Sequence, residues 1–176
     1  MSRVLLWDTN VWSHLLLGTP DKRAQVQARL RELAAAYPGA RRATSRICIA
    51  EALVAARRLP DPQAASEAEA ALRAEFDNPN LIVVELTDSV VGSGRQVADV
   101  AATLRAQALI AASARRGTQP AGADGGKLKL PDAFIAASCL VFSPSAVLLT
   151  ENTADFMQVA ADGSSQPIAG LTVEAL

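Results

Sequence analysis

Two acidic residues stand where a buried strand is expected to end. Asp8 directly follows the apolar run 3–7, and Asp155 follows the apolar run 146–150 by a few residues. The carboxyl ends of parallel strands meet at one edge of a sheet, where open α/β sheets bind ligands. Both carboxylates are therefore expected at that edge. The alternative is a helix cap for Asp8 and a cap or surface acid for Asp155.

A third acid, Glu51, lies on the apolar face of the predicted helix 45–59, at an angular position between Ile47 and Val54. A lone carboxylate on such a face is costly to bury in its charged form, so it needs a partner or a metal ion. Arg58, two turns later on nearly the same face, is the alternative partner, although the separation is long for a direct pair. The pattern favours a role in a site.

The fourth acid, Asp132, follows Pro131 in the first turn of the predicted helix 131–142. The helix dipole favours a negative charge at this end by roughly 0.3–1 kcal/mol, which is also its ordinary structural explanation. If all four acids gather, their mutual repulsion raises their pKa values. A divalent cation relieves that repulsion. Ligation by oxygen alone suits Mg²⁺ or Mn²⁺, which assist phosphoryl chemistry by activating water and offsetting charge.

The sequence contains one histidine, His14. A metal site of the H-E-x-x-H type and any cluster of several histidines are therefore excluded. A catalytic triad would need His14 itself as the base. The chemistry is expected to depend mainly on carboxylates.

Alternating strands and helices position these acids. Strands are expected at 3–7, 81–86, 146–150 and 171–173, and helices at 9–17, 20–37, 45–59, 63–76, 90–115, 131–142 and 152–159. This order predicts an α/β fold with a mainly parallel sheet. The length of 176 residues fits one domain over 1–176.

The composition is that of a globular chain, with 50% hydrophobic and 20% charged residues. No apolar run approaches the ~20 residues of a membrane span, and the first residues do not resemble a signal peptide, so a cytoplasmic location is expected. Cys48 and Cys139 each lie in an apolar stretch and are predicted to be core residues rather than a disulfide.

Basic residues are concentrated in segment 22–58. It holds nine basic and two acidic residues, a net charge of +7, whereas the rest of the chain holds eight basic and sixteen acidic residues, a net charge of −8. Such a segment can attract a polyanion while the whole chain stays near neutral. The alternative is an ordinary arginine-rich helix surface.

Four segments that carry the acids resemble, in order, those of PIN domains and more narrowly VapC-type toxin ribonucleases. They are Val4-Leu5-Leu6-Trp7-Asp8-Thr9-Asn10, Thr44-Ser45-Arg46-Ile47-Cys48-Ile49-Ala50-Glu51, Pro131-Asp132-Ala133-Phe134-Ile135-Ala136-Ala137 and Leu148-Leu149-Thr150-Glu151-Asn152-Thr153-Ala154-Asp155-Phe156. The ending Ile168-Ala169-Gly170-Leu171-Thr172-Val173 is similar to the last strand of the family. The resemblance spans nearly the whole chain.

The resemblance implies a PIN-like α/β/α sandwich and Mg²⁺- or Mn²⁺-dependent hydrolysis of RNA by a water held at the metal. It also implies an inhibitory antitoxin and a homodimer. The residues it assigns are the catalytic and metal-binding acids Asp8, Glu51, Asp132 and Asp155, and the supporting residues Thr9, Asn10, Thr150 and Asn152. The basic segment is then a candidate RNA surface, chiefly Arg41, Arg42 and Arg46.

The chain is longer than compact toxins of the family, with extra segments at 60–79 and 117–130. The second contains Asp124, a competing candidate for the third acid, but glycines follow it instead of an apolar helix. One alternative function is a non-catalytic PIN-like module that binds RNA or a partner. A phosphatase similar to the haloacid dehalogenases is a weaker alternative, because its D-x-D motif would need an acid where Asn10 stands.

Overall fold

The computed structural model describes residues 3–115, 128–159 and 164–176. Asp124 and the loop expected at 117–126 lie outside the described residues. Within them, the helices are α1 (Thr9–Leu16), α2 (Pro20–Ala36), α3 (Arg46–Arg57), α4 (Pro62–Phe76), α5 (Val97–Arg115) and α6 (Leu130–Leu140), with short 3₁₀ turns η1 (Thr153–Phe156) and η2 (Ile168–Gly170). In the described part of the chain, no helix is both long and apolar enough to cross a membrane.

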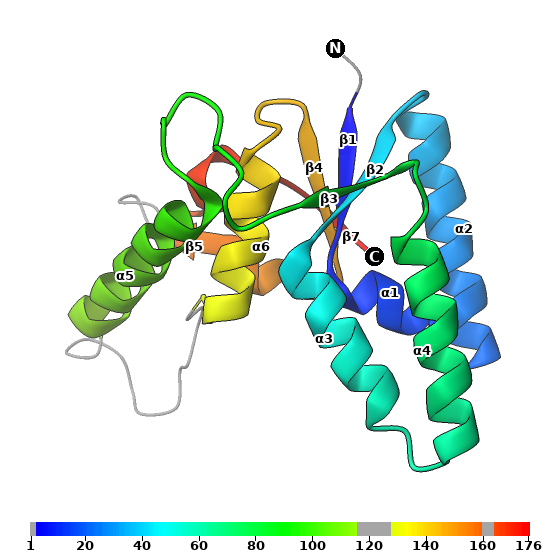
Figure 1. Ribbon diagram of the computed structural model, residues 1–176. Helices are drawn as coiled ribbons and strands as arrows, with labels where there is room; N and C mark the ends of the chain where they lie inside the picture. Colours follow the sequence, from blue (N-terminus) through cyan, green and yellow to red (C-terminus); the bar gives the residue numbers. More distant parts are fainter. Residues whose placement is uncertain (1–2, 116–127, 160–163) are drawn as a thin grey trace.

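Five strands form one parallel sheet in the order β3-β2-β1-β4-β7. They are β1 (Val4–Trp7), β2 (Arg41–Ser45), β3 (Leu81–Val84), β4 (Ala146–Thr150) and β7 (Thr172–Ala175), and a separate antiparallel pair joins β5 (Met157–Val159) to β6 (Ser165–Pro167). Right-handed crossovers carry α1 to α4 over one face and α5 and α6 over the other, as Figure 1 shows. The predicted α/β sandwich with a parallel sheet is confirmed.

The order of the strands places a crevice at one point of the sheet. From β1 the chain proceeds outward to β2 and β3, and then returns to β4 on the other side of β1. The connection that leaves β1 leads to β2 on one side, and the connection that leaves β4 leads to β7 on the other, so the two diverge at the carboxyl ends of β1 and β4. Ligands of open α/β sheets bind at such a switch point.

The predicted secondary structure needs correction at three places. The sequence did not predict β2, because Arg41-Arg42-Ala43-Thr44-Ser45 is not an apolar run, although its last three residues are buried. The helix expected over 90–115 begins at Val97, since a turn with positive φ at Gly92 and Gly94 precedes it. The helix expected over 152–159 is the short turn η1 followed by strand β5.

Two successive buried hydrogen bonds join α1 to the sheet. The indole Nε1 of Trp12 donates to Thr44 Oγ1 at 3.0 Å, and this hydroxyl donates to the backbone oxygen of Trp7 at 3.1 Å. Trp12 packs in turn against the rings of Trp7 and Phe76. Thr44 thus links β2, β1 and α1 just below the edge where Asp8 lies.

We expect Thr44→Val to lower the free energy of unfolding by about 1–3 kcal/mol, because the valine leaves the buried Trp12 N–H without its acceptor. Urea denaturation measures the change. The matched control is Thr172→Val on the exposed position of β7, where a change within about 0.5 kcal/mol is expected. Equal stability of Thr44→Val and the wild type would contradict the role of this hydroxyl.

Candidate active site

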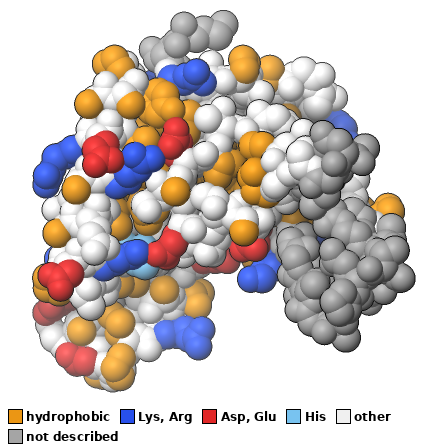
Figure 2. Space-filling view, turned by 180° about the vertical axis from the view of Figure 1, so that it is seen from behind, with side chains coloured by type: hydrophobic (Ala, Val, Ile, Leu, Met, Phe, Trp, Pro, Cys, Tyr) orange, Lys and Arg blue, Asp and Glu red, His pale blue; other side chains and the backbone are white. Residues whose placement is uncertain are grey.

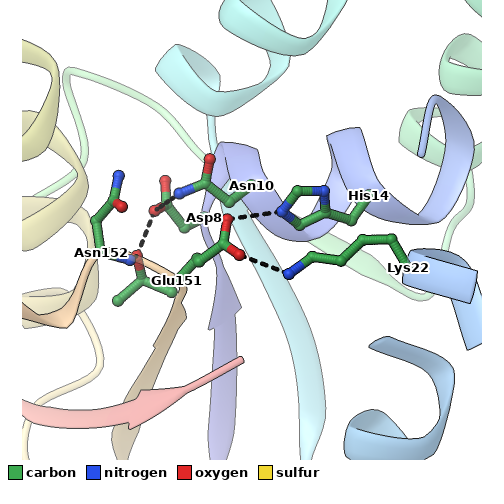
Figure 3. A network of polar contacts seen from close by, with 7 residues as sticks. Asp8, Asn10, His14, Lys22, Glu151 and Asn152 are labelled. Atoms are coloured by element: carbon green, nitrogen blue, oxygen red, sulfur yellow. Dashed lines mark hydrogen bonds and ion pairs between the residues drawn. The ribbon is translucent and has the colours of Figure 1, made fainter. Parts of the chain in front are cut away.

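Asp8 occupies the carboxyl end of β1, at the switch point. It is the N-cap of α1, and its Oδ1 accepts the backbone N–H of Thr9 at 2.6 Å. Its Oδ2 accepts the hydroxyl of Thr150, the last residue of β4, at 2.6 Å, with the Asn10 amide farther away at 3.5 Å (Figure 3). Donors on α1 and β4 therefore hold both carboxylate oxygens. Asp8 is buried, with an exposed fraction of 5%.

The segment after β4 brings a second acid to the same place. Thr150 Oγ1 accepts the backbone N–H of Asn152 at 3.0 Å, and the Asn152 carbonyl accepts the N–H of Asp155 at 3.0 Å. These bonds form the tight turn that leads into η1. Asn152 supports the site through its backbone, whereas Thr150 supports it through the hydroxyl that contacts Asp8.

Glu51 reaches the site from α3. Its Oε2 accepts the hydroxyl of Thr9 at 2.6 Å, so Thr9 holds Asp8 with its backbone and Glu51 with its side chain. Ser45 fixes the start of α3 by accepting the backbone N–H of Cys48 at 3.1 Å. Glu51 therefore pairs with Thr9, and the described residues show no ion pair between it and Arg58.

Asp132 lies in the first turn of α6, on the other face of the sheet. Its Oδ2 accepts the backbone N–H of Lys129 at 3.3 Å. Burial first, and then the negative charges of Asp155 and Asp8, raise the pKa of Asp132 to about 6, against the opposing N–H and charge of Lys129.

The pKa of Asp8 is also raised, first by burial and then by the charges of Glu51 and Asp155. The hydrogen bonds from Thr150 and Thr9 oppose this shift without cancelling it. Asp8 thus interacts with each of the other three acids. The four carboxylates that the sequence singles out thus lie close enough for their charges to act on Asp8 or Asp132.

The four carboxylates offer only oxygen ligands. Among the described residues, no three His, Cys, Asp or Glu side chains are grouped so as to hold one metal ion. Mg²⁺, however, is usually bound by one or two carboxylates and keeps several waters. A cation would also relieve the repulsion that contributes to the raised pKa values of Asp8 and Asp132. The donor set fits a hydrated Mg²⁺ or Mn²⁺.

The arginines proposed to contact RNA do not gather at this edge. Arg41 and Arg42 begin β2, in register with Val4 and Leu5, at the end of the sheet away from Asp8. Arg42 pairs with Glu75 at 3.7 Å and stacks over the Trp7 ring. Arg46 begins α3 at the nearer edge, where Glu85 pairs with it. Contact of these arginines with RNA stays a prediction.

One feature near the acids escaped sequence reasoning. Glu151 forms ion pairs with His14 and Lys22 beside Asp8 (Figure 3). These partners are more than 120 residues away in sequence, and no spacing rule links them.

The prediction that Cys48 and Cys139 are core residues rather than a disulfide is confirmed, since both are free and buried. Burial, together with the charge of Asp8, raises the pKa of the Cys48 thiol to about 11, so it is no nucleophile near neutral pH.

Solved structures similar to this chain come from toxin–antitoxin complexes. VapBC2 from Rickettsia felis, bound to a promoter DNA fragment, has a TM-score of 0.58 at 16% identity, over 98% of each chain. DNA-bound VapBC from Salmonella typhimurium has a TM-score of 0.57 at 20% identity, over 99% of this chain and 98% of that one. FitAcB from Neisseria gonorrhoeae has a TM-score of 0.52 at 20% identity, over 96% of this chain and 95% of that one.

Sequence comparison alone gives no such match: no protein-family model and no curated protein matches the chain. The likeness is one of structure, and at these identities it concerns the fold. It extends over nearly the full length of this chain and of its neighbours. The chain has the PIN-like fold of the VapC toxins found in VapBC complexes.

Proposed function

We propose that the chain is a Mg²⁺- or Mn²⁺-dependent endoribonuclease and the toxin of a toxin–antitoxin pair. The observation that carries this proposal is the convergence of Asp8, Glu51, Asp132 and Asp155 at the switch point of the sheet. Burial and neighbouring negative charges raise the pKa of Asp8 and of Asp132, so the arrangement is costly to keep, and a phosphodiester-cleaving metal site gives it a use.

Asp8, Glu51, Asp132 and Asp155 would hold the metal, directly or through its waters. When bound, the metal would lower the pKa of a water and offset charge that develops on the phosphoryl group. Thr9 and Thr150 would keep Asp8 and Glu51 oriented before substrate arrives, because their hydroxyls already donate to these carboxylates. Such preorganisation lowers the cost of reaching the reactive geometry.

The chain's own proton acceptor would be a carboxylate. The sole histidine, His14, points to Glu151 instead. In this proposal the reaction needs no imidazole base.

The partners follow from the proteins that share the fold. The VapBC and FitAcB structures are complexes, two of the three bound to DNA. We propose that this chain likewise assembles with a small antitoxin. RNA as substrate and a second copy of the chain in a homodimer are the remaining proposed partners.

Cleavage of a mixed structured RNA pool tests the proposal. We expect cleavage with Mn²⁺ or Mg²⁺ and none with EDTA. Asp8→Asn and Asp132→Asn should each reduce the rate roughly 100-fold or more, because even an outer partner of a metal ligand contributes about 10–100-fold. Gel analysis of the products measures the rate, and circular dichroism checks the fold.

The matched control for cleavage is Asp99→Asn, an exposed acid in the first turn of α5, which should cleave at the wild-type rate. Full activity of Asp8→Asn or Asp132→Asn would refute the site assignment. Binding of RNA without cleavage in Mn²⁺ would favour the non-catalytic module.

The raised pKa of Asp132 predicts a pH-dependent stability in EDTA. Because the folded pKa is about 6 and the unfolded value 3.8, this carboxyl lowers stability as pH rises through that window. Asp132→Asn should therefore have a higher Tm than the wild type at pH 7.5, by a few degrees. The difference should shrink as the pH falls from about 6 to 4. Thermal unfolding measured across this range tests it.

Added Mg²⁺ should raise the Tm of the wild type more than that of Asp132→Asn, since a ligand that binds only the folded state stabilises it. Asp99→Asn serves again as the control and should respond to Mg²⁺ like the wild type. A variant less stable than the wild type at pH 7.5, or an equal response of both to Mg²⁺, would contradict the proposed role of Asp132.

A further inference from the structure

A second charged cluster lies next to the four acids. Glu151 Oε2 contacts His14 Nε2 at 2.7 Å, and its Oε1 accepts from Lys22 Nζ at 2.6 Å. Glu151 directly follows Thr150, whose hydroxyl holds Asp8. In Figure 3 the carboxylate of Glu151 lies between Asp8 on one side and His14 and Lys22 on the other. The cluster therefore borders the candidate active site.

The three side chains are accessible from solvent. The exposed fractions are 24% for His14, 34% for Lys22 and 41% for Glu151. Figure 2 shows the single histidine at the surface beside a basic and an acidic side chain, with further acidic side chains extending across this face. Exposed ion pairs contribute only about 0–1 kcal/mol. Another anion can thus replace the Glu151 carboxylate at little cost in stability.

The local structure favours an anion at this position. Lys22 lies in the first turn of α2, where Thr19 caps the helix and the helix dipole disfavours a cation. The dipole and Lys22 both attract negative charge to this point. A Cβ at Gly18 would lie 2.4 Å from the His14 backbone oxygen, so only glycine permits the turn that brings Lys22 back beside His14.

Half of the other cations of the basic segment are already neutralised. Four arginines of segment 22–58 pair with acids that lie outside it: Arg29 with Glu174, Arg42 with Glu75, Arg46 with Glu85 and Arg57 with Glu69. Arg46 also lies near the edge of the sheet where Asp8 lies, but two hydrogen bonds hold it to Glu85. The Lys22 pair adjoins Asp8, because its partner Glu151 directly follows Thr150, which donates to Asp8.

We propose that Lys22 and His14 form a subsite for a backbone phosphate of RNA next to the phosphate that is cleaved, and that Glu151 fills this subsite until RNA displaces it. A carboxylate and a phosphodiester both carry one negative charge and accept N–H donors. The exchange keeps the charge of the subsite unchanged. The inference rests on the proposed ribonuclease function and identifies a contact that positions its substrate.

Substitutions of the two partners in the Lys22–Glu151 pair should have opposite effects. Lys22→Gln should weaken binding of the RNA pool in EDTA several-fold at low salt, and should reduce the slope of log Kd against log salt by about 0.7–1. Glu151→Gln should strengthen binding several-fold, because it removes the competing carboxylate. If the cluster only stabilises the fold, both substitutions break the same ion pair and both weaken RNA binding.

The Glu69–Arg73 pair on α4 provides the matched control. Glu69 also bridges two cations, Arg57 and Arg73, with a similarly exposed geometry. Arg73→Gln and Glu69→Gln should leave RNA affinity and its salt slope unchanged. Binding is measured by fluorescence anisotropy, with thermal unfolding as the check that each variant is folded.

The unmodified protein gives a second readout, since His14 is the only histidine in the sequence. RNA added in EDTA should shift the NMR signals of its ring. Unshifted signals at saturating RNA, an unchanged salt slope in Lys22→Gln, or weaker binding by both variants would each overturn the inference while leaving cleavage intact. A wild-type protein that neither binds nor cleaves RNA would overturn the inference together with the proposed function.

Discussion

The burial of a carboxylate beside other carboxylates is the constraint on which the rest of this structure depends. Asp8 is buried with Glu51 and Asp155 near it, and the net effect is a raised pKa despite two short hydrogen bonds. Those bonds come from the first residue of α1 and the last residue of β4. The parallel register of β1 with β4 therefore sets the position of the acid, and any slip of one residue would remove the Thr150 donor.

Charges that are separated in sequence are paired in space. The basic segment 22–58 has a net charge of +7, yet five of its cations pair with acids elsewhere in the chain. Asp8, Glu51 and Asp132 accept hydrogen bonds from hydroxyl and backbone donors instead of forming such pairs. A sequence-level excess of charge thus says little about which charges remain available. Here the pairing leaves the negative potential concentrated at one edge of the sheet.

The sequence predicts those parts of the fold that local patterns encode. Apolar runs predict β1 and β4, the acids that follow them mark the site, and Pro131 marks the start of α6. Strand β2 escapes prediction because its ladder with β1 and β3, rather than its own residues, makes it a strand. Its small polar residues Thr44 and Ser45 are buried by neighbours that lie far away in sequence. Long-range pairs such as Glu151 with Lys22 escape for the same reason.

A nuclease with an acidic centre faces an electrostatic conflict, because the carboxylates that attract a metal also repel the polyanion to be cleaved. Positive charge close to the acids resolves it, but a free cation there would pair with the acids themselves and weaken their hold on the metal. A cation neutralised by a separate, exposed carboxylate avoids both outcomes. Glu151 pairs with Lys22 beside the acids proposed to hold the metal, and an exposed pair can be exchanged for a phosphate at little cost. On this reasoning, the charged groups beside the centre matter as much to substrate binding as the centre itself.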